Sequence, residues 1–237
     1  MKLEILSETD SFVAVNKPAG LLSIADREGT EISLKRILQD RYGEIFVVHR
    51  LDRDTSGVIV FAKDEITHRH LSIAFEDRSV EKYYRGLLSG VPADKEGTID
   101  APIAENMARR GMMLIHKRGK PSVTDYKVLE SFGKFSLVEF QIHTGRTHQI
   151  RVHMQSLGHP IVCDALYGDP APVYLSSIKK NYNLSKNELD ERPILSRLAL
   201  HSFRLKFDTP DGITHDIEAP LPKDFRALVQ QLRKWKK

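Results

Sequence analysis

Apolar and polar positions follow two rhythms along this chain, and each rhythm predicts one kind of element. Short apolar or alternating runs predict strands at residues 3–6, 12–15, 58–61, 80–88, 123–129, 135–143 and 197–207. Apolar residues spaced three or four apart predict helices at 30–42, 65–77, 147–158 and 224–235. Gly43 and Gly158 mark two helix ends, because glycine readily adopts the left-handed conformation that closes a helix.

The order of these elements predicts the fold class. Most successive strands are close enough in sequence to be joined as hairpins, so we expect an α+β fold with a mixed, largely antiparallel central β-sheet flanked by helices and loops. The chain has no internal repeat, linker or low-complexity segment, and we expect residues 1–237 to form a single domain. Residues 169–193 are polar and rich in lysine, asparagine and serine, which predicts a surface insertion.

Residues 47–61 place a cluster of charged side chains between two apolar runs. Buried charge is costly unless it is paired, so this cluster is a candidate site as well as a candidate turn. Asp52 is the first residue of interest, because Arg50 and Arg53 beside it would keep its carboxylate ionised in a shielded place. By itself the pattern fits a charged surface turn equally well.

A different chemistry also fits this cluster. A strand followed by Asp-x-Asp-Thr is how Asp-nucleophile phosphohydrolases of the haloacid-dehalogenase type present their nucleophile and bind magnesium, and Asp52, Asp54 and Thr55 have that spacing. Such enzymes have a doubly wound parallel sheet, whereas the strands here are predicted to pair as hairpins. The phosphohydrolase is therefore the alternative rather than the main hypothesis.

Basic residues recur at two further places. Lys17 lies in a loop at 16–23 and is expected to face outward or toward a site. Residues 106–120 contain five lysines or arginines and no acid, with Gly111 and Gly119 predicting a hairpin or mobile loop. This segment fits either a solvated loop or an arm that contacts the phosphates of a nucleic acid.

The segment around 144–158 combines a glycine turn with a helix. His148 and Arg151 are three residues apart and are expected to share a helical face, and Arg146 beside the helix N-terminus favours an anion. Histidines 143, 148 and 153 do not share one helical face and have no accompanying carboxylates, so we predict no metal site. In the strand at 80–88, Tyr83 and Tyr84 must point to opposite faces, one of them inward.

Composition narrows the class of protein further. The 41% hydrophobic and 29% charged content is ordinary for a globular protein, and the net charge of +4 suits a polyanionic partner without requiring one. A single cysteine, Cys163, excludes an internal disulfide framework and a thiolate-rich zinc site. No apolar run approaches the roughly 18–20 residues of a membrane span, and the N-terminus is too short and acidic for a secretory signal. We therefore expect a cytoplasmic protein.

Several motifs together resemble one family. His49 to Gly57 resembles the signature of the RluA-type RNA pseudouridine synthases. The other motifs follow in the family's order, at 16–21, at Lys82-Tyr83-Tyr84, at 144–161 and at 197–201. The resemblance spans roughly residues 5–235, and two of its motifs are long and specific.

The resemblance implies a pseudouridine synthase catalytic domain that isomerises specific uridines in ribosomal or transfer RNA, with no metal or cofactor. It implies Asp52 as the catalytic carboxylate, Arg151 as the cation that holds it ionised, and Tyr84 as the ring that stacks on uracil. Whether Asp52 attacks the ribose, attacks the base or removes a ribose proton stays open. A catalytically inactive RNA-binding homologue is a further alternative.

The same resemblance and the local charges predict which residues bind RNA. Arg53 is expected to help hold the target uridine out of its stack. The expected RNA-binding residues are Arg50, Arg53, Lys17, Arg146, His148, Arg109, Arg110, Lys117 and Arg118. Many relatives carry an N-terminal S4-type RNA-binding domain, for which this chain has no room, so RNA selection is expected to depend on the loops of the catalytic domain. We expect a monomer with no membrane or metal partner.

Overall fold

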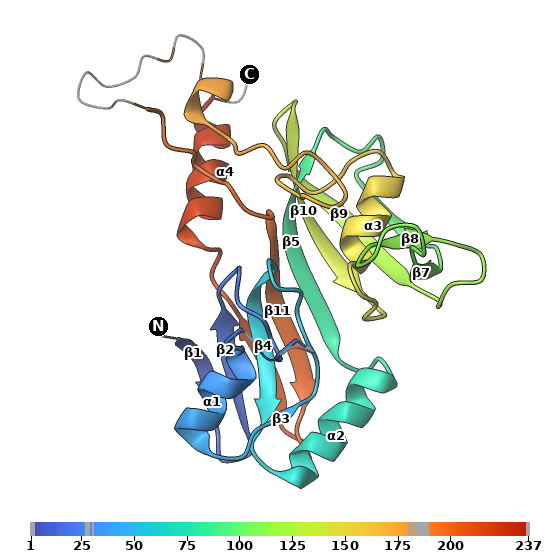
Figure 1. Cartoon of the computed structure of the whole chain (residues 1–237), viewed down its shortest axis with the longest axis vertical. Helices are drawn as coiled ribbons and strands as arrows, with labels where there is room; N and C mark the ends of the chain where they lie inside the picture. Colours follow the sequence, from blue (N-terminus) through green and yellow to red (C-terminus); the bar gives the residue numbers. More distant parts are fainter. Residues whose placement is uncertain (1–2, 27–28, 30, 180–181, 183–189, 236–237) are drawn as a thin grey trace. The chain divides into compact units, whose positions relative to one another are not determined.

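The computed structural model describes residues 3–26, 29, 31–179, 182 and 190–235 (Figure 1). The chain divides into two compact units, each built from separate stretches of sequence. The first unit comprises Met1–Tyr84, Gln141–Thr147 and Leu200–Pro220. The second unit comprises Arg85–Phe140, His148–Ala199 and Leu221–Lys237. The expectation that residues 1–237 act as a single catalytic domain stays a prediction.

A mixed sheet forms the centre of the first unit. Its strands follow the order β1 (Glu4–Glu8), β2 (Phe12–Lys17), β4 (Ser56–Ala62), β11 (Leu200–Asp208) and β5 (Glu81–Ser89), with β3 (Phe46–Val47) beside β4 and β12 (Thr214–Glu218) beside β11. Strand β4 pairs in parallel with β11, whereas the β1–β2, β2–β4, β3–β4 and β11–β12 pairs are antiparallel. The predicted mixed, largely antiparallel sheet is therefore confirmed.

The core of the first unit comes from alternate residues of its strands. Phe12, Ala14, Val58 and Val60 are fully buried and pack with Leu71 of helix α2 (Glu65–Glu76). Residues two apart share one face of a strand, so β2 and β4 each present a continuous apolar surface to that helix. Figure 1 shows α2 lying along this sheet, together with the shorter helix α1 (Leu34–Tyr42).

Both helices of the first unit begin and end at recognisable residues. The Ser33 hydroxyl accepts a hydrogen bond from the Arg36 N–H at the start of α1, and the Asp64 carboxylate accepts one from the Thr67 N–H in α2. Gly43 has a φ of 79° and ends α1, as predicted. Capping of this kind satisfies backbone N–H groups that have no partner within the helix.

In the second unit, β5 is followed in the same strand order by β10 (Phe135–Ile142), β9 (Val123–Ser131) and β6 (Glu96–Asp100). Strands β7 (Ile103–Glu105) and β8 (Met113–Ile115) form a separate antiparallel hairpin. The helices of the second unit are α3 (Gln149–Ser156), α4 (Lys223–Trp235) and a 3-10 turn at Leu175–Ser177. Ile103, Val152 and Tyr167 form a small buried cluster under the hairpin.

The structure differs from the sequence-based expectation at a few elements. Strands β6 and β12 were not predicted, and β11 begins at Leu200 rather than at 197. A hairpin is present near the predicted place, but its first strand, β7, lies before the segment 106–120. Part of the surface insertion expected at 169–193 lies outside the described residues, namely 180–181 and 183–189. Among the described helices, none is long and apolar enough to cross a membrane.

Candidate active site

A tight turn before β4 fixes the backbone around Asp52. The Thr55 N–H donates to the Asp52 carbonyl at 3.2 Å and closes the turn. The buried Ser23 hydroxyl accepts from the Leu51 N–H at 3.1 Å and donates to the Leu51 carbonyl at 2.8 Å. Asp52 itself is half-buried, so its carboxylate is held by a rigid backbone at the edge of the core.

Gly57 lets the strand after this turn approach its parallel neighbour closely. Its φ is 117°, and a Cβ at this position would lie 2.1 Å from the Ser202 carbonyl oxygen. Next to it, the Ser56 hydroxyl lies 2.9 Å from Nδ1 of the buried His201, whose Nε2 lies 3.1 Å from the Ala219 carbonyl. Because a carbonyl can only accept, Nε2 carries the proton and Nδ1 accepts from Ser56.

The side chain of Lys17 is buried and has a structural role, although it was expected to face outward. It is the last residue of β2 and is fully buried. Its ammonium donates to the carbonyls of Pro18 at 3.0 Å, Leu21 at 2.7 Å and Arg53 at 2.9 Å. The expectation that Lys17 faces outward is therefore wrong, and its expected role in binding RNA stays a prediction. Instead, Lys17 ties the loop after β2 to the residue next to Asp52.

Arg50 and Arg53 are both exposed, and their expected role in binding RNA stays a prediction. The Arg50 guanidinium donates to the Thr147 hydroxyl at 3.1 Å, and the Arg53 guanidinium pairs with Glu31 at 2.9 Å. An exposed ion pair contributes about 0–1 kcal/mol, so Arg53 can exchange Glu31 for an RNA group at little cost.

A cavity of 460 Å³ in the first unit contains Tyr84 on its wall. It is lined by Val48, His49, Arg50, Phe75, Glu76, Arg78, Lys82, Tyr84, Ile142, Thr144, Gly145 and Arg146. Tyr84 is 8% exposed, whereas Tyr83 is only half-buried and lies under the Arg204 guanidinium. The prediction that the two rings face opposite sides is confirmed, with Tyr84 as the inward one.

The negative charge of Asp52 affects the pKa of the Tyr84 hydroxyl. Burial, followed by the negative charge of Asp52, raises the pKa of the Tyr84 hydroxyl, while a hydrogen bond with the Ser202 side chain acts in the opposite direction. At neutral pH the hydroxyl therefore keeps its proton and is available as a donor.

His49 forms another part of the cavity wall. Its Nε2 accepts a hydrogen bond from the Val60 N–H at 3.0 Å, and its ring stacks on Phe75 at 4.5 Å. Burial, together with the positive charge of Lys82, lowers the pKa of His49 to about 3. The imidazole is therefore neutral at pH 7 and anchors the turn to strand β4.

Arg151 lies in the second unit and pairs with an acid that the sequence analysis missed. Its Nε and Nη2 each lie 2.7 Å from a carboxylate oxygen of the fully buried Asp164. Asp164 also accepts from the backbone N–H groups of Leu166 and Tyr167. The sequence did offer one signal for Asp164: it is an acidic residue inside an otherwise apolar run that begins at Ile161. The proposed pairing of Arg151 with Asp52 stays a prediction.

His148 and Arg151 do not share a helical face, contrary to expectation. Helix α3 begins at Gln149, and His148 before it has a φ of 56°, outside the helical range. Both side chains instead meet Tyr167. Its hydroxyl lies 2.8 Å from His148 Nδ1, and its ring centroid lies 5.0 Å from the Arg151 guanidinium carbon.

The hairpin of β7 and β8 and the turn that follows it carry the predicted basic residues on their surface. We call Arg109, Arg110, Lys117 and Arg118 the hairpin cations; all four are exposed, and none forms an ion pair within the described part of the chain. The Asn106 carboxamide oxygen accepts from the N–H groups of Ala108 and Arg109, and the Met113 N–H donates to the Tyr167 hydroxyl at 2.7 Å. The hairpin is thus anchored, with its positive charge available for binding.

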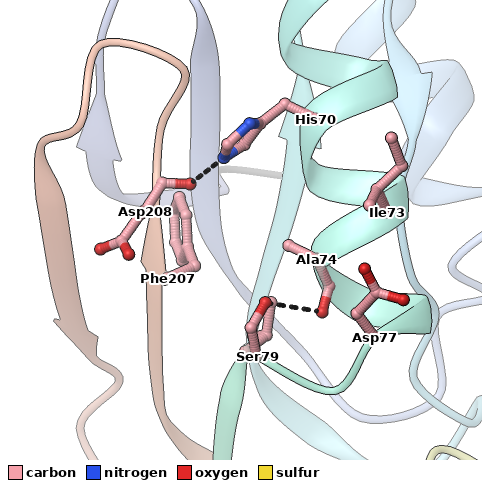
Figure 2. A pocket seen from close by; sticks show the side chains of 8 residues that line it. His70, Ile73, Ala74, Asp77, Ser79, Phe207 and Asp208 are labelled. Carbon is pink, nitrogen blue, oxygen red and sulfur yellow. Dashed lines mark hydrogen bonds between the residues drawn. The ribbon is translucent and has the colours of Figure 1, made fainter.

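A second cavity in the first unit, of 230 Å³, lies between α2 and β11 (Figure 2). Figure 2 shows His70 of α2 pointing toward Asp208 of β11, where Nε2 lies 3.1 Å from the carbonyl oxygen. None of the predicted site residues lines this cavity, so it is not the candidate active site. Among the described residues, no cluster of three or more His, Cys, Asp or Glu side chains is placed to hold a metal ion.

Comparison with known proteins identifies the family. Residues 11–156 match the family described as RNA pseudouridylate synthase. The chain is 33% identical to ribosomal large subunit pseudouridine synthase D of Haemophilus ducreyi, over 98% of this chain and 71% of that protein. It is 37% identical to the protein of the same name from Neisseria meningitidis serogroup B, over 98% of this chain and 62% of that protein. The chain thus spans 62–71% of the length of these two relatives.

Solved structures agree with this assignment. Human RNA pseudouridylate synthase domain containing 4 is 28% identical, with a TM-score of 0.71 over 97% of this chain and 93% of that chain. Human RNA pseudouridylate synthase domain containing 1 is 29% identical, with a TM-score of 0.72 over 98% and 95% of the two chains. The fold and the motifs around Asp52, Tyr84 and Arg151 define an RNA-modifying isomerase. The chain belongs to the RNA pseudouridylate synthase family, and neither the phosphohydrolase nor the inactive homologue is favoured.

Proposed function

We propose that this protein converts a uridine in RNA to pseudouridine, with Asp52 as the catalytic carboxylate. The assignment of this role to Asp52 rests on the position of its carboxylate in the structure. It is half-buried on a turn fixed by Ser23 and Lys17, and its charge acts on the buried Tyr84. The reaction breaks the bond between ribose and the base nitrogen, turns the uracil, and forms a carbon–carbon bond. A carboxylate held rigidly against the substrate is suited to act as nucleophile or base in such a step.

Tyr84 contributes a ring and a protonated hydroxyl. Its ring forms part of the wall of the 460 Å³ cavity, where an extruded uracil can stack on it. Because the pKa of Tyr84 is raised, the hydroxyl acts as a hydrogen-bond or proton donor and not as a base at neutral pH.

Arg151 is proposed as the cation that favours the ionised form of Asp52 during the reaction. Its two bonds to Asp164 fix the plane of the guanidinium, and the Tyr167 ring supports one face. A guanidinium held in this way cannot rotate freely, and the preorganised charge then needs no rearrangement as the reaction proceeds.

The RNA contacts are proposed to come from both units. Arg50, Arg53 and Arg146 belong to the first unit, while His148 and the hairpin cations belong to the second. Ribosomal RNA is the preferred substrate class because the named relatives are ribosomal large subunit enzymes. Such a substrate places the protein in the cytoplasm, and we propose that it acts as a monomer without metal.

The experiment that tests this function is tritium release from RNA labelled on carbon five of uracil, with excess chelator. Wild type, Asp52→Asn and Asp54→Asn would be compared on ribosomal and transfer RNA pools. Asp54 is the matched control, because it is an exposed acid in the same turn. We expect release by wild type and Asp54→Asn and none by Asp52→Asn.

Two results would contradict the proposal. Undiminished release by Asp52→Asn would remove this carboxylate from the mechanism. Absence of release by wild type from both pools would reject the proposed activity on these RNAs. Loss of release in Asp54→Asn as well as in Asp52→Asn would show that the turn as a whole is required, and would not single out Asp52 as the catalytic carboxylate.

A further inference from the structure

The cavity beside Tyr84 carries far more positive than negative charge. Four of its lining residues are cationic, namely Arg50, Arg78, Lys82 and Arg146, and one is acidic, Glu76. Glu76 is exposed and forms no ion pair within the described part of the chain. Several cationic side chains gathered around one hollow favour an anionic ligand.

Lys82 is the most informative of the four. It is only 6% exposed, and its ammonium makes one hydrogen bond, to the Val80 carbonyl at 2.8 Å. Within the described residues it has no carboxylate partner, and the Phe75 ring lies 5.7 Å from Nζ. A buried ammonium without a counter-charge is costly, and such a group is expected where a ligand supplies the missing negative charge. Burial, together with the positive charge of Arg78, lowers the pKa of Lys82 to about 8.

Arg78 supplies a second cation to the same cavity. It lies between α2 and β5 and has a φ of 64°, a conformation that residues other than glycine rarely adopt. Its exposed side chain forms part of the cavity lining and makes no hydrogen bond or ion pair within the described residues. The Ser79 N–H donates to the Ala74 carbonyl at 3.0 Å, so the left-handed conformation of Arg78 closes helix α2.

We propose that this cavity binds a phosphate group of the RNA backbone, with Lys82 and Arg78 as phosphate-binding residues. Guanidinium groups match the oxygens of a phosphate in pairs, and a lysine supplies a compact point charge. Tyr84 lines the same cavity, so the bound phosphate belongs to the target nucleotide or its immediate neighbour. The identity of the polymer depends on the proposed function, whereas the anion site depends on the cavity alone.

The test measures RNA affinity across a range of salt concentrations. Lys82→Met and Arg78→Asn each remove one charge, and asparagine tolerates the left-handed backbone at position 78. We expect each variant to bind RNA about tenfold more weakly and to lower the salt slope by about one. Lys206→Met is the matched control, because Lys206 on the neighbouring strand β11 already pairs with Glu81 at 2.9 Å. It should retain the wild-type slope.

Two further readouts separate phosphate binding from a structural role. Removing an unpaired buried charge should leave the melting temperature of Lys82→Met unchanged or higher, whereas loss of a structural contact would lower it. RNA affinity of the wild type should also fall as pH rises through about 8, where Lys82 loses its proton, and this fall should be absent in Lys82→Met. The cavity's other charged groups are three arginines and Glu76, and the lowered pKa of His49 and the raised pKa of Tyr84 keep both of these groups neutral at this pH.

The outcomes are distinct. Wild-type affinity and salt slope in Lys82→Met and Arg78→Asn would overturn the proposal, and if Lys82→Met fails to fold, Arg78→Asn decides alone. Inorganic phosphate, titrated at constant ionic strength, should bind wild type more tightly than Lys82→Met; equal binding would also overturn it. If phosphate distinguishes the two proteins but RNA does not, the cavity takes a free phosphate rather than the backbone. Tritium release by the wild type is scored separately, so the proposed function can fail without affecting this result.

Discussion

Replacing Asp164 with alanine leaves the buried guanidinium of Arg151 without its carboxylate. The Arg151 side chain is 6% exposed and that of Asp164 is fully buried, so water cannot take the place of the missing partner. Removing one member of a buried ion pair costs about 3–5 kcal/mol of unfolding free energy. For a chain of this size, that loss lowers the melting temperature by roughly 6–20 °C.

The reverse substitution should be milder. In Arg151→Met, the Asp164 carboxylate keeps the N–H groups of Leu166 and Tyr167 as donors. We therefore expect a loss on the order of 1–3 kcal/mol, with a folded protein whose activity is lower by orders of magnitude. The double variant Arg151→Met with Asp164→Leu replaces the pair by apolar groups and should recover most of the stability lost in Asp164→Ala, but none of the activity.

Urea unfolding followed by circular dichroism measures the stabilities, and tritium release measures the activities. Glu105→Ala, which removes an exposed acid of the same unit, is the control and should unfold like wild type. Wild-type stability in Asp164→Ala would refute the argument from buried charge. A double variant no more stable than Asp164→Ala would show that Asp164 acts through contacts other than Arg151. Near-normal turnover in Arg151→Met would exclude Arg151 from the mechanism.

Three further predictions concern binding, backbone and pH. Changing all four hairpin cations to glutamine should lower the salt slope of RNA binding by roughly three, and an unchanged slope would mean that the hairpin is only solvated. Gly57→Ala should cost several kcal/mol (about 3 or more), because its Cβ would lie 2.1 Å from the Ser202 carbonyl oxygen, whereas Gly145→Ala, with open space around it, should melt near the wild-type temperature. The pKa of His49 is lowered to about 3, so its contribution to stability is present above pH 6.5 and is lost as pH falls from 6.5 toward 3. Unfolding measured at successive pH values should show a weaker acid-side loss in His49→Gln than in wild type, and equal losses would contradict this.

The sequence by itself determined the elements whose signals are local. Periodicity located α4, whose predicted apolar positions Phe225, Leu228, Val229 and Leu232 are all buried. Gly43 ends α1 as predicted, because a helix end depends on the conformation of one residue. Alternation along β5 required the two adjacent tyrosines to face opposite sides, although only the structure showed that Tyr84 is the inward one.

The tertiary structure decided which side chains meet. Lys17 is buried because three carbonyls from two loops converge on it, and Asp164 neutralises Arg151 because the chain folds back after α3. Gly57 is required because β4 pairs with β11, about 145 residues later in the chain. Strands β6 and β12 were also not predicted. Periodicity and caps report the conformation of neighbouring residues, whereas these contacts join residues distant in sequence, and their partners are set by packing of the whole unit.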